Sequence, residues 1–175
     1  LAFHEAIPGH HLQNALNLEN DNLSLYRRFG YYTSAFGEGW ALYSERLSLE
    51  LGLADDLYDE LGVLQSELFR AVRLVVDTGM HFKRWTREEA MDYMKKKTGM
   101  SDTEVRVEIE RYIVWPGQAC SYKVGMLKIL ELREKSKLEL GENFDIRDFH
   151  SAVLDHGEPP LFIVEELVNE MTNNR

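Results

Sequence analysis

The fold of this chain is limited most by one short stretch near its start, His4-Glu5-Ala6-Ile7-Pro8-Gly9-His10-His11-Leu12-Gln13. The stretch holds three of the six histidines, beside a glutamate and around a Pro-Gly pair. A His-Glu pair followed closely by another His is typical of a helix that binds zinc through two imidazoles and uses the carboxylate as a base. The second ligand usually stands four residues after the first, where this chain has proline. Any metal site here must therefore accommodate a broken helix.

Helix geometry indicates which histidines can meet. On an unbroken helix His11 would point nearly the same way as His4 but lie about 10 Å further along the axis, too far for zinc–nitrogen bonds of about 2.1 Å. His10 would point away from His4. If Pro8-Gly9 forms a two-residue insertion, His10 takes the position of the usual second ligand, because glycine permits the excursion and proline removes the competing hydrogen bond. We predict that His4 and His10 share a metal, with His11 beside the site or as the alternative ligand.

A third ligand is predicted on a later helix. Helical zinc hydrolases often complete the site with a glutamate, and Glu38 follows His10 by 28 residues. The glycines on either side of Glu38 allow a helix, a metal or a substrate to approach closely. Glu45 lies two turns further along the same face, where its carboxylate can orient a ligand imidazole by a hydrogen bond. Taken alone, Glu38 is equally well explained as a solvated surface residue.

The composition excludes several classes of protein. A formal net charge of −10 argues against nucleic acid or an anionic membrane as a partner. No apolar run reaches the ~20 residues that a membrane span needs. Cys120 is the single cysteine, which rules out an internal disulfide. With 175 residues, the chain is long enough for one domain with a substantial core.

Helical signals dominate the chain, and no long segment alternates with period two. Thr86 with Glu89, and Ser101 with Glu104, are capping boxes that start helices. The expected helical segments are 2–18 (broken at the Pro-Gly pair), 23–29, 31–51, 55–80, 87–97, 102–115, 116–141, 146–154 and 159–171. We predict an all-α fold of about eight helices, forming a single helical domain over residues 1–175.

One helix shows a long apolar stripe, which is expected to face the core. The stripe consists of Leu57, Leu61, Leu64, Leu68, Val72 and Val75. It falls within segment 55–80, whose predicted start is Asp55. The spacing of three and four residues is that of an amphipathic helix.

The chemistry of this chain begins at its fourth residue, with no methionine or leader segment before it. We therefore expect a C-terminal part of a longer protein, and the missing N-terminal portion as its neighbour. Any targeting signal would lie upstream, so cytoplasmic, periplasmic and secreted locations all stay open.

Two motifs resemble the bacterial domain of unknown function 885 family. They are His-Glu-x-x-Pro-Gly-His-His-Leu-Gln at 4–13 and Gly-Glu-Gly-Trp-Ala-Leu-Tyr-Ser-Glu at 37–45. The similarity continues through 76–81 and 115–125, and so covers most of the chain. The family resembles in turn the gluzincin metallopeptidases, including carboxypeptidase-like and oligopeptidase-like helical enzymes. Their second helix carries two glutamates seven residues apart, as Glu38 and Glu45 are here.

The resemblance implies a metallopeptidase-type site on a protein several times longer than this chain. Some related peptidases carry His-x-Leu-Gln after the base, which favours His10 over His11 as the second ligand. We expect Zn²⁺ on His4, His10 and Glu38, with Glu5 as the general base that serves the attacking water and the leaving amine. The expected substrate is a peptide or a peptide-like molecule.

Several further residues have competing interpretations. Tyr122 either donates a hydrogen bond to the oxyanion or packs as an ordinary helix tyrosine. Asp77 and His81 either contact the substrate or a metal ligand or, as we expect, form a plain surface pair with Arg73. Arg111 either binds a peptide carboxylate or pairs with a neighbouring acidic residue. For the whole chain, the alternatives to a peptidase are an inactive metal-binding domain and a helical interaction domain.

Overall fold

A computed structural model describes residues 1–54 and 56–174. Within these residues the chain is all-α and contains no strand, as the periodicity predicts. The helices are α1 (Ala2–Glu5), α2 (His10–Glu19), the π-helical η1 (Tyr26–Gly30), α3 (Ser34–Glu50), α4 (Leu57–His81), α5 (Arg87–Thr98), α6 (Asp102–Val114), α7 (Gln118–Leu140), the 3-10 turn η2 (Gly141–Asn143), α8 (Ile146–Leu154) and α9 (Leu161–Asn173). Over the described ranges no helix is both long enough and apolar enough to cross a bilayer.

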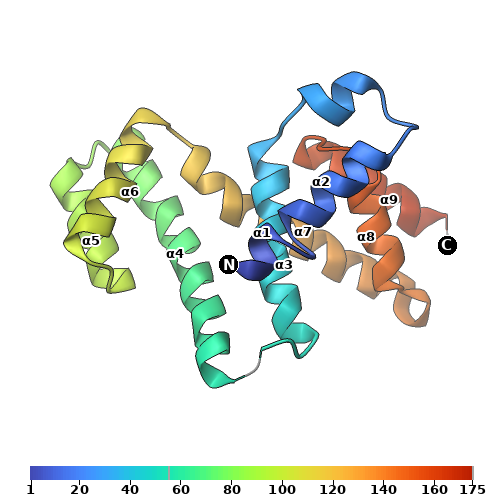
Figure 1. Ribbon diagram of the computed structural model, residues 1–175, viewed down its shortest axis with the longest axis horizontal. Coiled ribbons are helices and arrows are strands. Elements are labelled where there is room, and N and C mark those ends of the chain that lie inside the picture. Colours follow the sequence, from blue (N-terminus) through green and yellow to red (C-terminus); the bar gives the residue numbers. More distant parts are fainter. Residues whose placement is uncertain (55, 175) are drawn as a thin grey trace.

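Two hydrophobic cores share helix α7. The larger core joins α3 and α7 to α8 and α9. The smaller core joins α4, α5 and α6 to the first turn of α7 through Ala119. In Figure 1, α5 and α6 lie at one end of the molecule and α8 and α9 at the other, with α3 between them. The candidate ligands lie in this central region, where α1 and α2 cover α3.

The centre of the fold is a close contact between α3 and α7. A Cβ atom on Gly39 would lie 2.5 Å from Cα of Gly125, and a Cβ on Gly125 would lie 1.9 Å from the carbonyl oxygen of Ala35. Carbon atoms do not approach one another so closely without displacing the backbone. Glycine at both positions is therefore what allows the two helices to touch.

Most helix ends follow the local signals. Both capping boxes are present, at Thr86 and at Ser101, and α8 has the predicted bounds. The prediction that α7 begins at Pro116 was wrong. Gly117 has φ +80°, outside the helical region, so α7 starts at Gln118. The backbone N–H of Gly117 donates instead to the carboxylate of Asp77, at 3.0 Å.

The prediction for the α4 stripe was wrong over most of its length. Its predicted start, Asp55, lies outside the described residues; α4 begins at Leu57 and is capped by the Asp56 side chain. Exposure falls from 78% at Leu57 to 47% at Leu68, and Val72 is buried. The reason is that all buried residues of α4 lie between positions 72 and 79, where α5, α6 and α7 cover it.

A partly buried histidine packs against the larger core. His150 on α8 has Nε2 2.8 Å from the hydroxyl oxygen of Tyr43, and its ring stands at 90° to that of Trp40. Burial lowers the pKa of His150 to about 4, and the positive charge of Arg133 acts in the same direction. The folded protein therefore holds this imidazole neutral.

The contact between α3 and α7 predicts a sharp penalty for adding one methyl group. Gly39→Ala should lower the free energy of unfolding by about 1–3 kcal/mol, as overpacking usually does. Urea denaturation measures the change. The matched control is Gly62→Ala on α4, where an added Cβ has nothing within 4 Å. That change should stabilise the helix by about 0.5–1 kcal/mol. Equal effects at both positions would contradict the interpretation.

His150 predicts a pH-dependent loss of stability. In the unfolded chain His150 has the ordinary histidine pKa of about 6.5. As the pH falls, His150 is therefore protonated in the unfolded chain before it is protonated in the folded protein. Stability is therefore complete above pH ~6.5 and declines by about 2–3 kcal/mol toward pH ~4. Denaturation of the native protein and of His150→Phe across this range tests the prediction. The variant should be less stable at pH 7 but decline less on acidification; parallel curves would count against it.

Candidate metal centre

The first helix is broken completely at the Pro-Gly pair. α1 ends at Glu5 and α2 begins at His10, with a cis Ile7–Pro8 peptide bond between them. The predicted two-residue insertion in one helix is thus two separate helices. Gly9 packs against the end of α1, because a Cβ there would lie 2.0 Å from the carbonyl oxygen of His4. Trp40 of α3 fixes the turn by donating its indole N–H to the Pro8 carbonyl, at 2.8 Å.

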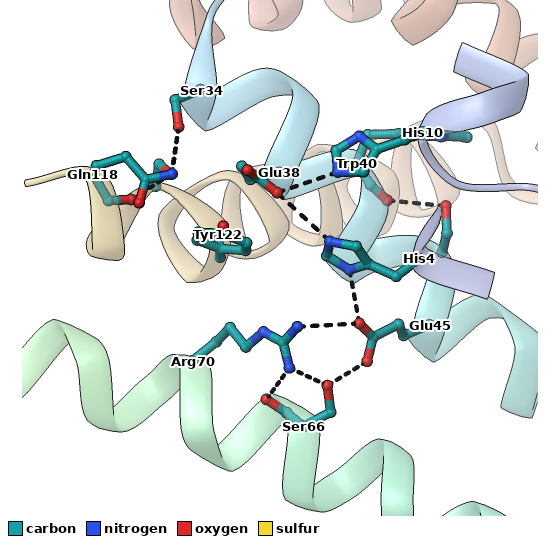
Figure 2. Close-up of polar contacts among 12 residues, drawn as sticks. His4, His10, Ser34, Glu38, Trp40, Glu45, Ser66, Arg70, Gln118 and Tyr122 are labelled. Atoms are coloured by element: carbon teal, nitrogen blue, oxygen red, sulfur yellow. Dashed lines mark hydrogen bonds and ion pairs between the residues drawn. The ribbon is translucent and has the colours of Figure 1, made fainter. Parts of the chain in front are cut away.

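This turn brings His10 close to His4 and to Glu38. The two imidazole centroids are 5.0 Å apart. Oε2 of Glu38 lies 3.2 Å from Nε2 of His10 and 3.6 Å from Nε2 of His4. In the part of the chain that the structure describes, these three residues form the group whose ligand atoms all lie within 4.8 Å of one another. Figure 2 shows them converging from α1, α2 and α3.

Glu45 binds the other side of the His4 ring. Its Oε1 is 2.7 Å from Nδ1 of His4, and both side chains are buried. Oε2 accepts a hydrogen bond from Ser66 of α4, at 2.6 Å, and Arg70 of α4 lies 3.7 Å from Oε1 (Figure 2). Because Nδ1 is bound to Glu45, Nε2 is the nitrogen that faces Glu38. This is how carboxylates usually orient a metal-binding imidazole.

The protonation of the site follows from these contacts. Burial alone would raise the pKa of Glu38, but hydrogen bonds from His10 and His4 outweigh it and hold that pKa well below its usual range. Burial likewise opposes ionisation of Glu45, and its contacts with His4, Ser66 and Arg70 lower the pKa. For His4, the two carboxylates overcome burial and raise the pKa. Both glutamates are therefore anionic near neutral pH.

The donor set fits a small divalent cation. Two imidazole nitrogens and one carboxylate oxygen are ligands that zinc accepts, leaving a fourth position open. Ligand atoms around a tetrahedral zinc are about 3.4 Å apart, given bonds of about 2.1 Å. The separations of Oε2 of Glu38 from Nε2 of His10 and of His4, 3.2 and 3.6 Å, are close to this value. The side chain of His4 is 4% exposed, against 22% for His10 and 13% for Glu38, so the cluster opens to solvent on their side.

The other predicted site residues differ in burial and in their contacts with this cluster. Tyr122 is buried on α7, its ring stacked on that of His4 with centroids 6.2 Å apart. Its hydroxyl also contributes to the lowered pKa of Glu38. Glu5 is exposed at the end of α1. His11 is exposed on α2 and does not belong to the cluster found among the described residues.

The family model for "Bacterial protein of unknown function (DUF885)" matches residues 1–168. The chain belongs to the DUF885 family. Among curated proteins, no match to the chain is found.

Two solved structures are similar to this DUF885 chain. One is the crystal structure of "the putative lipoprotein from Colwellia psychrerythraea", with 54% identity over 99% of this chain and a TM-score of 0.95. The other is the structure of "a putative lipoprotein of unknown function from Shewanella oneidensis", with 29% identity over 96% of this chain and a TM-score of 0.86. The chain spans 30% of the length of each.

Three residues of the DUF885 chain lie elsewhere than predicted. Asp77 is buried and accepts from the backbone of Gly117, so it caps the start of α7. His81 has Nε2 2.9 Å from the Tyr112 carbonyl oxygen. Arg73 is buried and pairs with Glu108, at 3.0 Å. The predicted surface pair of Asp77 and His81 with Arg73 was therefore wrong, because the packing of α6 and α7 against α4 gives each side chain another partner.

Sequence reasoning missed the residues that hold α2 in place. Gln13, one turn after His10, donates to Oε1 of Glu158 at 2.8 Å. The backbone N–H of Thr33 donates to Oε2 of the same carboxylate, at 3.2 Å. Burial raises the pKa of Glu158 despite these bonds. Glu158 thus joins α2 to the start of α3. It lies 145 residues after Gln13, a separation over which no sequence spacing signals a contact.

Proposed function

We propose that this chain carries the zinc site of a peptidase-like hydrolase. The observation that supports it best is the convergence of His4, His10 and Glu38, with Glu45 bound to the far side of His4. His4, His10 and Glu38 would hold the ion. Bound zinc would supply a Lewis acid that polarises a carbonyl and lowers the pKa of water.

Glu5 and Tyr122 take the two remaining roles in this proposal. Glu5 follows a ligand directly and is exposed, so its carboxylate is available to take a proton from the attacking water and return it to the leaving amine. Tyr122 carries its hydroxyl next to Glu38 and donates it to the oxygen that becomes negatively charged. Glu45 keeps Nε2 of His4 directed toward the ion through its bond to Nδ1. The rest of the protein would supply the opposite wall of a peptide-binding cleft.

The proposal predicts one tightly bound zinc ion per chain. The protein in its natural length is equilibrated with zinc near pH 7, dialysed, and analysed for metal content. Glu45→Gln should weaken zinc binding by about 10- to 100-fold, as loss of an orienting carboxylate does. His4→Ala, His10→Ala and Glu38→Ala should weaken it further. His11→Ala is the matched control, because the exposed neighbour of His10 lies outside the cluster. Unaltered zinc content in the His4→Ala, His10→Ala and Glu38→Ala variants would contradict the ligand set.

Glu5→Gln tests the hydrolytic step. Loss of a general base should lower kcat on a mixed peptide library by about 100- to 10,000-fold, while zinc stays bound. The control is Glu19→Gln, which removes an exposed carboxylate from α2. Cleavage products are identified by mass spectrometry.

The same experiments separate the alternatives. Bound zinc without turnover, and without an effect of Glu5→Gln, would identify an inactive metal-binding domain. Failure to bind zinc near neutral pH, where imidazoles can lose their protons, would favour a helical interaction domain.

A further inference from the structure

Three arginines from two helices surround Tyr122. Arg73 of α4 lies with Cζ 4.7 Å from the centroid of the tyrosine ring, and Arg70, one turn earlier, lies 5.8 Å from it. Arg111 of α6 approaches the other end of the side chain, with Nη2 3.5 Å from the hydroxyl oxygen. A concentration of guanidinium groups thus borders the candidate metal centre on its Tyr122 side (Figure 2 shows Arg70 there).

Two of the neighbouring carboxylates each contact more than one basic side chain. Glu108 is shared, since it pairs with Arg73 at 3.0 Å and with Arg111 at 3.6 Å. Glu45 is shared between Arg70 and His4. Nη1 of Arg73 is buried and has no hydrogen-bond partner within the described ranges. A buried guanidinium nitrogen without a partner is costly, so the charge of Arg73 is incompletely compensated.

Arg111 is the one of the three that a ligand can reach. Its side chain is 32% exposed, against 13% for Arg70 and 5% for Arg73. Its Nη2 also donates to Oε1 of Gln118, at 2.6 Å, which is the first residue of the 23-residue helix α7. The positive end of that helix dipole adds to the field at the guanidinium. Arg111 is therefore oriented, cationic and accessible.

We propose that Arg111, oriented by Gln118 and Tyr122, binds a carboxylate of the peptide substrate close to the bond that is cleaved. This inference rests on the proposed hydrolytic function. The planar fork of arginine matches a carboxylate better than any other side chain does. Because Nη2 lies 3.5 Å from the Tyr122 hydroxyl, the bound carboxylate lies within roughly two residues of the scissile carbonyl, at about 3.5 Å per residue. The substrates are thus peptides cut near a free carboxylate, either the C-terminal carboxylate or an acidic side chain.

Three versions of one peptide distinguish these sources. The first has a free C-terminus, the second a C-terminal amide, and the third an amide with aspartate as its last residue. The zinc-loaded protein in its natural length should cleave the acid with a higher kcat/KM than the plain amide. If the aspartyl amide matches the acid, the recognised group is any nearby carboxylate; if it matches the plain amide, the group is the C-terminus.

Arg111→Gln should lower the ratio of kcat/KM for the acid to that for the amide by about 10- to 100-fold, chiefly through KM. Arg111→Lys should restore part of the ratio, because it keeps the charge but not the fork. Arg106→Gln, an exposed site on the same helix, is the matched control. A general loss of folding or of bound metal lowers kcat/KM for the acid and for the amide by the same factor. The ratio of the two values is therefore unaffected by such a loss.

The inference and the proposed function fail in different ways. Equal cleavage of the acid and the amide by the native protein overturns the inference and leaves the peptidase proposal standing. If no peptide is cleaved, the peptidase proposal fails. Calorimetric titration of the Glu5→Gln protein with the acid and the amide then decides the inference: tighter binding of the acid, lost in Glu5→Gln/Arg111→Gln, supports it, and equal binding overturns it.

Discussion

The backbone contact between Gly39 and Gly125 determines the geometry on which the candidate site depends. Glu38 directly precedes the first glycine, and Tyr122 lies about one turn before the second. The close approach of α3 and α7 therefore places the Glu38 carboxylate next to the Tyr122 phenol. The same approach buries the aromatic face of α3, so the site and the larger core share one cause.

A second constraint is the position of the His4 ring between two carboxylates of one helix. Glu38 and Glu45 are seven residues apart, which places both on the same face of α3. Buried anions are tolerated only when other groups compensate them. Here α4 contributes to that compensation, through Ser66 and Arg70 on Glu45. The candidate metal centre is thus tied to α4 as well, although its ligands all come from α1, α2 and α3.

The sequence was most informative where the physical rule is local. Thr86 and Ser101 start helices because each side chain caps its own first turn, and no other part of the chain is involved. Helix geometry also showed that His4 could meet a later histidine only if the Pro-Gly pair broke the helix, and the rings of His4 and His10 lie 5.0 Å apart across that break. The α4 leucines show the limit of periodicity. A repeat of three and four residues identifies an apolar face but not the length over which another helix covers it. Likewise, the contacts of Ser66, Arg70 and Glu158 depend on how helices distant in the sequence pack together. The spacing of residues along the chain does not predict that packing.

The complete break at Pro8-Gly9 has a consequence for the thermodynamics of the N-terminal segment. α1 has only four residues, too few to persist as an isolated helix, so its order comes from contacts such as the Trp40 bond and the Glu45–His4 pair. A cation held by three separate elements would bind only when all three are in place. By mass action, the affinity for the cation would then include the free energy of ordering the first ten residues. Any change that loosens the segment would appear as weaker binding, even without touching a ligand.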